Sequence, residues 1–161
     1  MGQNDRPLVT IAIRHKDKWM KVQDIMTISV VCISDQASLK DAHALMTNRN
    51  VRHLPVISEQ DSSLVGILTH KKMVATVMAL VNKYGSGALD RRERAQTVES
   101  IMDKNYQHLT ADEPLPIVVE YFIDNKLGCL PVINAQGKVE GIVTSSDFVK
   151  LCAKLLKLSV S

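Results

Sequence analysis

The chain has 161 residues, of which 45% are hydrophobic and 23% charged, and its formal net charge is +3. This composition is typical of globular proteins and excludes disordered and low-complexity classes. The weak net charge does not indicate a polyanionic partner, and the 4% aromatic content is too low for surfaces that stack single-stranded nucleic acids.

Residues 1–19 are predicted to be an N-terminal extension, because Met20-Lys21-Val22 makes a natural start for the elements that follow. The extension lacks a compact apolar stretch followed by a cleavage site, so it does not resemble a signal peptide. The longest apolar stretch of the chain, Met73 to Val81, is far shorter than a membrane span. We therefore expect a cytoplasmic protein that has no membrane partner.

The cysteines show neither paired spacing nor an even count. They are Cys32, Cys129 and Cys152. Each lies in an apolar run, which predicts buried free thiols and agrees with a reducing compartment.

Residues 20–80 predict five elements. Ser38 offers an N-cap for the first helix, and Asp41 three residues later completes a capping box. The second helix begins at Thr69 and is apolar over a wide arc, which indicates burial against more than one neighbour. In chain order, the strands and helices are expected at 30–33, 38–46, 54–57, 65–68 and 69–81.

Residues 81–95 are predicted to be a linker, because the run is polar and contains glycines. Its arginines could begin a basic face for nucleic acid, but Glu93 is interleaved among them, so a solvated linker is the better interpretation. We predict no nucleic-acid partner.

Residues 96–156 repeat residues 20–80. In the second copy, Pro114 fits the first helical turn, and Asp112 or Glu113 is expected to cap that helix. Neither copy could bury its apolar helices alone, so we predict two copies packed together and a homodimer of the pair. The matched pairs include Met26 with Met102, Leu39 with Leu115, Pro55 with Pro131, Gly66 with Gly141 and Thr69 with Thr144.

Each copy has the order β-α-β-β-α, with L-P-V-I in its middle and G-h-h-T near its end, where h is apolar. These features resemble the CBS domain over about residues 20–156. Copy one (20–80) particularly resembles a repeat of the gamma subunit of AMP-activated protein kinase, and the whole chain resembles the acetoin utilization protein B group. The resemblance implies an α+β fold in which the two repeats pack pseudo-symmetrically through their small sheets, with two candidate nucleotide sites between them.

The second copy matches the nucleotide-binding motif G-h-h-T-x-x-D in full, from Gly141 to Asp147. The resemblance assigns Asp147 to the ribose hydroxyls, from which a carboxylate can accept hydrogen bonds. It assigns Thr144 and Ser146 to phosphate, at a strand-to-helix turn where backbone N–H groups suit an anion. The alternative is that Thr144 and Asp147 only cap the helix, and the two roles can coexist.

In this family the opposite copy completes the site. Arg52 and His53 resemble a basic pair that grips AMP phosphate, and Lys71 matches a further phosphate-contacting lysine. An ordinary solvated strand end is the alternative for the basic pair. The adenine slot is expected to be lined by Val30, Val31, Val51 and Ile142.

The reciprocal site has lost its polar groups. Lys72 stands in place of the ribose aspartate, and Leu127-Gly128-Cys129 stands in place of Val51-Arg52-His53. Both losses fall on one site although they lie on opposite copies. The sequence therefore predicts one complete site and one degraded site.

Catalytic motifs are missing from the sequence. No H-E-x-x-H, P-loop or nucleophile elbow is present, so we predict no enzymatic activity, no catalytic residue, no metal site and no obligatory cofactor. The predicted function is to bind AMP, ADP or ATP as a regulatory ligand and to modulate an unidentified partner, with acetoin or carbon metabolism as the setting. The alternative is a structural dimerisation module with an unused pocket.

Overall fold

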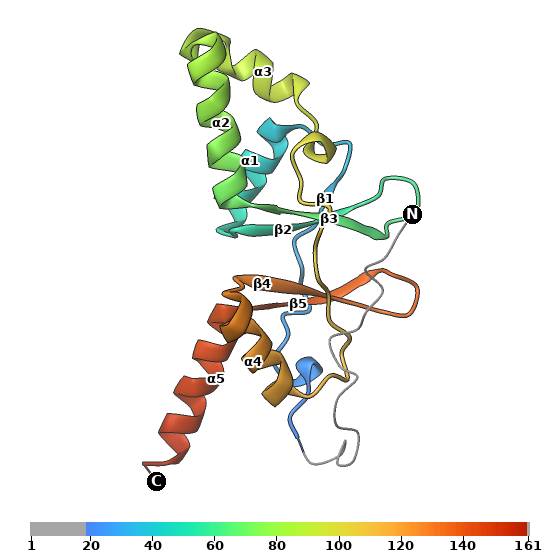
Figure 1. The fold of residues 1–161 in the computed structure, drawn as a ribbon, viewed down its shortest axis with the longest axis vertical. Helices are drawn as coiled ribbons and strands as arrows, with labels where there is room; N and C mark the ends of the chain where they lie inside the picture. The colour runs from blue at the N-terminus through green and yellow to red at the C-terminus, as the bar shows by residue number, and fades with distance from the viewer. Residues whose placement is uncertain (1–18, 161) are drawn as a thin grey trace. The chain divides into compact units, whose positions relative to one another are not determined.

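The computed structural model describes residues 19–160, so all of the predicted extension except Trp19 lies outside the described residues. The chain forms two compact units (Figure 1). Unit 1 consists of the chain up to Val30 together with the chain from Gln107 onward, and unit 2 consists of Val31–Tyr106. The fold is α+β, as predicted, with small sheets and five α-helices among the described residues.

Unit 2 contains three strands and three α-helices, which are β1 (Ile33–Ser34), α1 (Leu39–Arg49), β2 (His53–Ile57), β3 (Leu64–Thr69), α2 (His70–Tyr84) and α3 (Leu89–Ala95), with 3₁₀ turns at Ser86–Ala88 and Val98–Ser100. The sheet order is β1-β2-β3, in which β1 is parallel and β3 antiparallel to β2. Helix α3 packs against both α1 and α2 (Figure 1). The first predicted strand is thus shorter and later than residues 30–33.

Unit 1 contains the elements α4 (Leu115–Asn125), β4 (Cys129–Ile133), β5 (Val139–Thr144) and α5 (Ser145–Leu158), with a 3₁₀ turn at Val22–Asp24. Strands β4 and β5 are antiparallel. Leu109 forms a single parallel bridge with Val132, at the position where β1 pairs with β2 in unit 2. The two units therefore repeat one architecture.

The first residues of each copy pack with the other copy. The start of copy one lies in unit 1 with most of copy two, and the start of copy two lies in unit 2 with most of copy one. Val22 is fully buried in the core of unit 1, and Val98 is fully buried in the core of unit 2. Thr27 N donates to Ile142 O at 2.9 Å, and Ile142 N donates to Thr27 O at 3.0 Å. Asp103 pairs with Ile67 in the same way. The compact units and the sequence repeats consequently have different boundaries.

A methionine crosses a glycine in each of these exchanged pairings. A Cβ placed on Gly141 would lie 2.6 Å from the sulfur of Met26, and one on Gly66 would lie 2.6 Å from the sulfur of Met102. Only glycine leaves room for these contacts, which explains why methionine and glycine recur together in both copies.

The cap of the first helix agrees with the sequence in copy one but not in copy two. Ser38 Oγ accepts a hydrogen bond from Asp41 N at 3.0 Å, as predicted. The prediction that Asp112 or Glu113 caps α4 is wrong, because Pro114 occupies the N-cap position. Both carboxylates instead bind the preceding turn, where Asp112 accepts from the hydroxyl and Glu113 from the backbone N–H of Thr110.

The segment interpreted as a solvated linker ends α2 and forms α3. Glu93 is only 8% exposed, and its carboxylate lies 3.3 Å from His43 Nδ1 on α1. The guanidinium of Arg92 lies 3.6 Å from the ring centre of Tyr84, a cation–π contact with the end of α2. Glu93 and Arg92 therefore attach α3 to unit 2, while Asp90, Arg91 and Arg94 stay exposed to solvent, as the linker interpretation predicted.

All three cysteines are free, as predicted, but Cys152 is exposed and the other two are only half-buried. Burial raises the pKa of the Cys129 thiol to about 12. Among residues 19–160, no helix is both long and apolar enough to cross a membrane.

The exchanged segments predict which fragments fold. Residues 31–106 should unfold cooperatively on their own, whereas residues 20–80 should not, because they lose the buried Val98 and Ile101, each worth about 1.5–3 kcal/mol. Urea denaturation followed by circular dichroism measures both. A cooperative transition in 20–80 with none in 31–106 would contradict the assignment.

The ends of α1 and α4 differ in strain. Asn50 (φ 51°) and Lys126 (φ 52°) both adopt the left-handed conformation, which asparagine tolerates and lysine does not. Lys126→Gly should therefore raise the free energy of unfolding by about 0.5–1 kcal/mol, while Asn50→Gly should change it by only a few tenths. Thermal denaturation tests both variants, and destabilisation by Lys126→Gly would show that the side chain makes a compensating contact.

Candidate functional site

Asp147 lies in the first turn of α5 and is only 6% exposed. Its Oδ2 accepts hydrogen bonds from Thr144 N at 2.7 Å and from Thr144 Oγ1 at 3.2 Å. Its Oδ1 accepts from Thr27 Oγ1 at 3.4 Å, near the upper limit for a hydrogen bond. The capping contact is thus present, and Oδ1 is the more weakly held oxygen of the two.

Thr27 is a candidate site residue that the sequence reasoning missed. The double backbone pairing with Ile142 fixes its position beside β5, which brings its hydroxyl to Asp147. The available signal in the sequence was that Thr27 directly follows Met26, the methionine that packs against Gly141. Its importance follows only from the exchanged pairing, which a repeat comparison does not reveal.

The hydroxyls of unit 1 lie at the N-terminus of α5. Thr144 is the half-buried N-cap residue, and Ser146 is exposed in the first turn. The 14-residue helix carries a partial positive charge at this end, where Ser145 N donates to Gly128 O at 3.2 Å. Hydroxyl donors and backbone N–H groups together can hold an anionic oxygen.

Unit 2 carries a basic cluster, defined here as Arg52, His53, His70, Lys71 and Lys72. His53 pairs with Thr69 across β2 and β3, and His70 N donates to Arg52 O at 2.8 Å. The first turn of α2 contains no acidic residue. Among the described residues, none of these five side chains takes part in an ion pair. No carboxylate therefore compensates the charges of Arg52, Lys71 and Lys72, which lie near the N-terminus of a helix that already favours anions.

His53 is the least exposed member of the basic cluster. Burial, and next the positive charge of Arg52, lower the pKa of its imidazole below the usual value. The side chain is therefore neutral near pH 7, and an anion placed beside it would favour its protonation.

The ten residues predicted for the site divide equally between the units. Unit 1 holds Val30, Ile142, Thr144, Ser146 and Asp147, and unit 2 holds Val31, Val51, Arg52, His53 and Lys71. Within unit 1, Asp147, Thr144 and Ser146 lie together at the start of α5. Within unit 2, the side chains of Val31 and Val51 pack against the core. Lys71 lies in the first turn of α2, and Arg52 and His53 lie at the start of β2, where Arg52 O accepts from His70 N.

The positions predicted to be degraded show the opposite chemistry. Lys72 is exposed, and its backbone N–H donates to the hydroxyl of Thr69, so no carboxylate takes part in that cap. In the position equivalent to Thr27, unit 2 has Asp103. The two units thus differ in charge at equivalent positions. Unit 1 has the hydroxyl of Thr27 and the carboxylate of Asp147, whereas unit 2 has the carboxylate of Asp103 and the ammonium group of Lys72.

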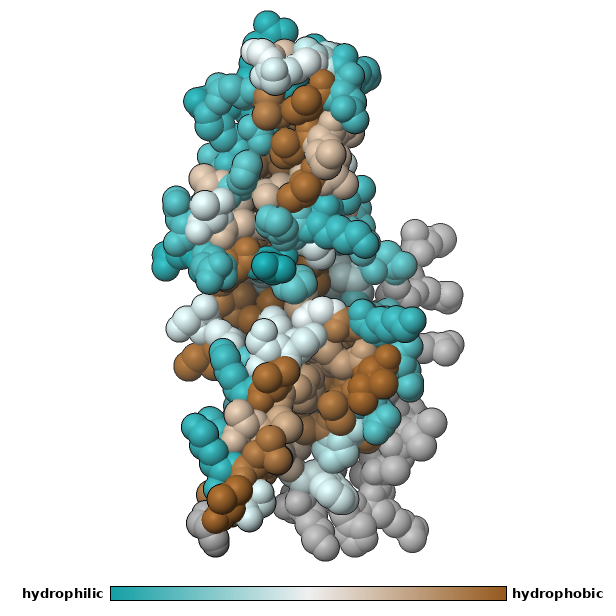
Figure 2. Space-filling view, turned by 90° about the vertical axis from the view of Figure 1, so that its left-hand side faces the viewer, coloured by the Kyte–Doolittle hydropathy of each residue, from teal (hydrophilic) through white to brown (hydrophobic). Residues whose placement is uncertain are grey.

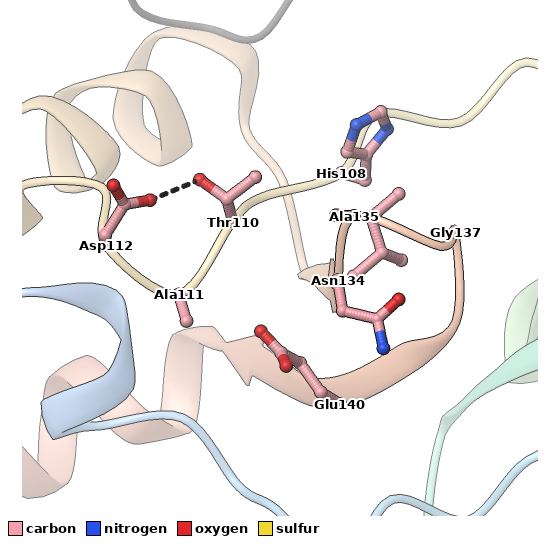
Figure 3. A pocket seen from close by; sticks show the side chains of 9 residues that line it. His108, Thr110, Ala111, Asp112, Asn134, Ala135, Gly137 and Glu140 are labelled. Atoms are coloured by element: carbon pink, nitrogen blue, oxygen red, sulfur yellow. Dashed lines mark hydrogen bonds between the residues drawn. The ribbon is translucent and has the colours of Figure 1, made fainter.

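A hollow of about 580 Å³ lies in unit 1 at the turn between β4 and β5. Figure 3 shows it between the segment 108–112 and the turn, with Glu140 among its lining residues. None of the ten predicted residues lines it. Across residues 19–160, no three His, Cys, Asp or Glu side chains gather closely enough to hold a metal ion.

Comparisons with known proteins relate this chain to one family. The curated relatives include homoserine O-acetyltransferase from Methanohalobium evestigatum, 29% identical over 130 residues, which are 81% of this chain and 24% of that protein. The chain therefore spans about a quarter of the length of such relatives.

Three of the similar solved structures show the range of the likeness. A protein assigned to acetoin utilization (AcuB) from Vibrio cholerae has a TM-score of 0.76 and 25% identity, over 89% of this chain and 98% of that one. The CBS domain pair of protein MJ0100, in complex with 5′-methylthioadenosine and S-adenosyl-L-methionine, has a TM-score of 0.67 and 26% identity, over 84% and 98%. CBSX2 in complex with AMP has a TM-score of 0.67 and 25% identity, over 84% and 97%.

The family itself is decided by a match over most of the chain. A model of the CBS domain matches residues 22–79 and again residues 98–154. Each match contains one β-β-α run with its Gly-h-h-Thr segment, Gly66–Thr69 in the first and Gly141–Thr144 in the second. The chain belongs to the CBS domain family and carries two copies of the domain.

Proposed function

We propose that this chain is a regulatory module that binds an adenine nucleotide of the AMP, ADP or ATP type and has no catalytic activity of its own. The observation that carries the proposal is the division of chemistry between the units. Unit 1 holds a buried carboxylate among hydroxyls, and unit 2 holds five basic side chains without a carboxylate partner. Together these are the groups that a ribose and a phosphate require.

The proposed contacts follow from this division. Asp147 accepts from the ribose hydroxyls, with Thr27 exchanging its weak hydrogen bond for one to the ligand. Thr144 and Ser146 bind phosphate together with Arg52, His53 and Lys71. The adenine slot consists of Val30, Val31, Val51 and Ile142. The complexes of MJ0100 with S-adenosyl-L-methionine and of CBSX2 with AMP support an adenosine ligand.

Regulation would act through the relation between the units. A ligand shifts an equilibrium between two arrangements only by its different affinities for them. A nucleotide held by groups from both units would favour the arrangement in which those groups meet. We propose a homodimer as the working form, a separate regulated protein as the reader of the change, and the cytoplasm as the location. The likeness to AcuB favours acetoin or carbon metabolism as the setting.

A structural dimerisation module is the second candidate. It is favoured by the capping contact, since Asp147 is already satisfied by Thr144 and Thr27 without a ligand. The two functions differ in one measurable property, which is the binding of adenylates.

Calorimetric titration with AMP, ADP, ATP and S-adenosylmethionine tests the proposal. We expect binding of one nucleotide per chain, and a loss of about 1.5–3 kcal/mol of binding free energy in Arg52→Gln and in Asp147→Asn, because each removes a charged hydrogen-bonding partner. Arg49→Gln and Asp112→Asn are matched controls on α1 and in the turn before α4, and both should bind normally.

The outcomes separate the two candidate functions. No heat with any adenylate would leave the dimerisation module as the better account. Normal binding by both site variants, or two nucleotides per chain, would refute the assignment of the site. Because Asp147→Asn also weakens a helix cap, Thr27→Val serves as a further variant that leaves the Thr144 contact intact.

The lowered pKa of His53 predicts a pH dependence of affinity. A bound phosphate should raise that pKa, so binding takes up a proton and nucleotide affinity should increase as the pH falls from 8 to about 6. The phosphate itself titrates near pH 6, so the comparison is with His53→Gln, in which the increase should be smaller. Equal pH profiles for the two proteins would exclude His53 from the phosphate site.

A further inference from the structure

An apolar groove of about 400 Å³ lies in unit 1 between α4 and α5. Trp19, Pro116, Val119, Leu151, Cys152 and Leu155 are among its lining residues. Trp19 and Leu155 are 55% and 54% exposed, values that are high for large hydrophobic side chains. Figure 2 shows hydrophobic side chains, in brown, gathered on the exposed face of α5.

The same place in unit 2 is covered by α3. Asp90 of α3 forms an ion pair with Lys40 of α1, and Glu93 of α3 lies 3.3 Å from His43 of α1. In the repeat, Lys40 and His43 match Pro116 and Val119, and Leu80 of α2 matches Leu155. The groove of unit 1 is therefore the counterpart of the surface that receives α3.

The replacement of Lys40 and His43 by Pro116 and Val119 specifies the occupant. A segment that lies in the groove must be apolar where α3 carries Asp90 and Glu93, because a carboxylate there would lose its hydration without gaining a cation. The occupant is thus an apolar counterpart of α3.

The position of Trp19 indicates where that occupant comes from. Helix α3 directly precedes the segment of copy two that packs in unit 2, and Trp19 directly precedes the segment of copy one that packs in unit 1. Upstream of Trp19, residues 8–13 read Leu-Val-Thr-Ile-Ala-Ile. Only residues 14–18 separate them from the groove, and such a tether reaches at most roughly 17 Å.

We propose that the groove between α4 and α5 is the docking site of residues 8–13 of this same chain. A tether of this length gives the segment an effective concentration in the millimolar range, well above that of a free partner. The docked segment would cover the groove between α4 and α5 in unit 1, as α3 covers the equivalent surface of α1 and α2 in unit 2. This inference does not depend on nucleotide binding.

Trp19 is the only tryptophan of the chain and lines the groove, so its fluorescence reports directly on the occupant. In the full chain we expect Trp19 to be shielded from acrylamide. Ile11→Asp should shift its emission to the red and remove the shielding, whereas Thr10→Asp should not. Leu155→Asp in the groove should have the effect of Ile11→Asp, and Val149→Asp, an exposed position on the same helix that does not line the groove, should have none.

The way in which the shielding of Trp19 from acrylamide depends on protein concentration identifies the occupant of the groove. Shielding that is independent of concentration and sensitive to Ile11→Asp supports docking within the chain. Shielding that appears only as concentration rises would assign the groove to a second copy, and a Trp19 open to acrylamide at every concentration would assign it to another protein; either result overturns the proposal. Circular dichroism identifies a Leu155→Asp variant that fails to fold, and Ile11→Asp then decides the matter, since it alters no residue of the groove.

Discussion

The double backbone pairing between Thr27 and Ile142, repeated by Asp103 and Ile67, is the constraint on which the rest of the structure depends. It satisfies the N–H and C=O groups of Ile142 on the outer edge of β5 and of Ile67 on the outer edge of β3. It also requires a glycine on each strand, because a methionine crosses there. In each unit the pairing residue comes from the start of one copy and the strand comes from the other copy. Each unit therefore contains residues from both copies.

The candidate site is a consequence of that exchange. Without the pairing at Ile142, the hydroxyl of Thr27 would not lie beside the Asp147 carboxylate, and Asp147 would be only a helix cap. The corresponding position in unit 2 has an acidic residue beside a strand whose helix begins with Lys72. One architecture thus carries two different charge patterns, with Asp147 in unit 1 and Asp103 with Lys72 in unit 2.

Much of the fold could be predicted from the sequence because the same pattern appears twice. The order of strands and helices, the cap at Ser38 and the starts of α2 and α5 follow from local patterns that tertiary contacts reinforce. The cap of α4 and the helix at 89–95 could not be predicted. Asp112 and Glu113 accept hydrogen bonds from Thr110 in the preceding turn, and α3 is held by contacts with α1 and α2 that are distant in the sequence. Glu93 shows the difficulty best, because its burial beside His43 is invisible in a polar run.

The discontinuity of unit 1 has a consequence for the order in which the chain folds during synthesis. Unit 2 is a single stretch, so all of its core residues are present once Tyr106 has left the ribosome. The segment around Val22 and Thr27 is made before unit 2, yet its partners in β5 are made after it. Until then this early segment has no edge to pair with, and it is the part of the nascent protein most exposed to pairing with the wrong strand.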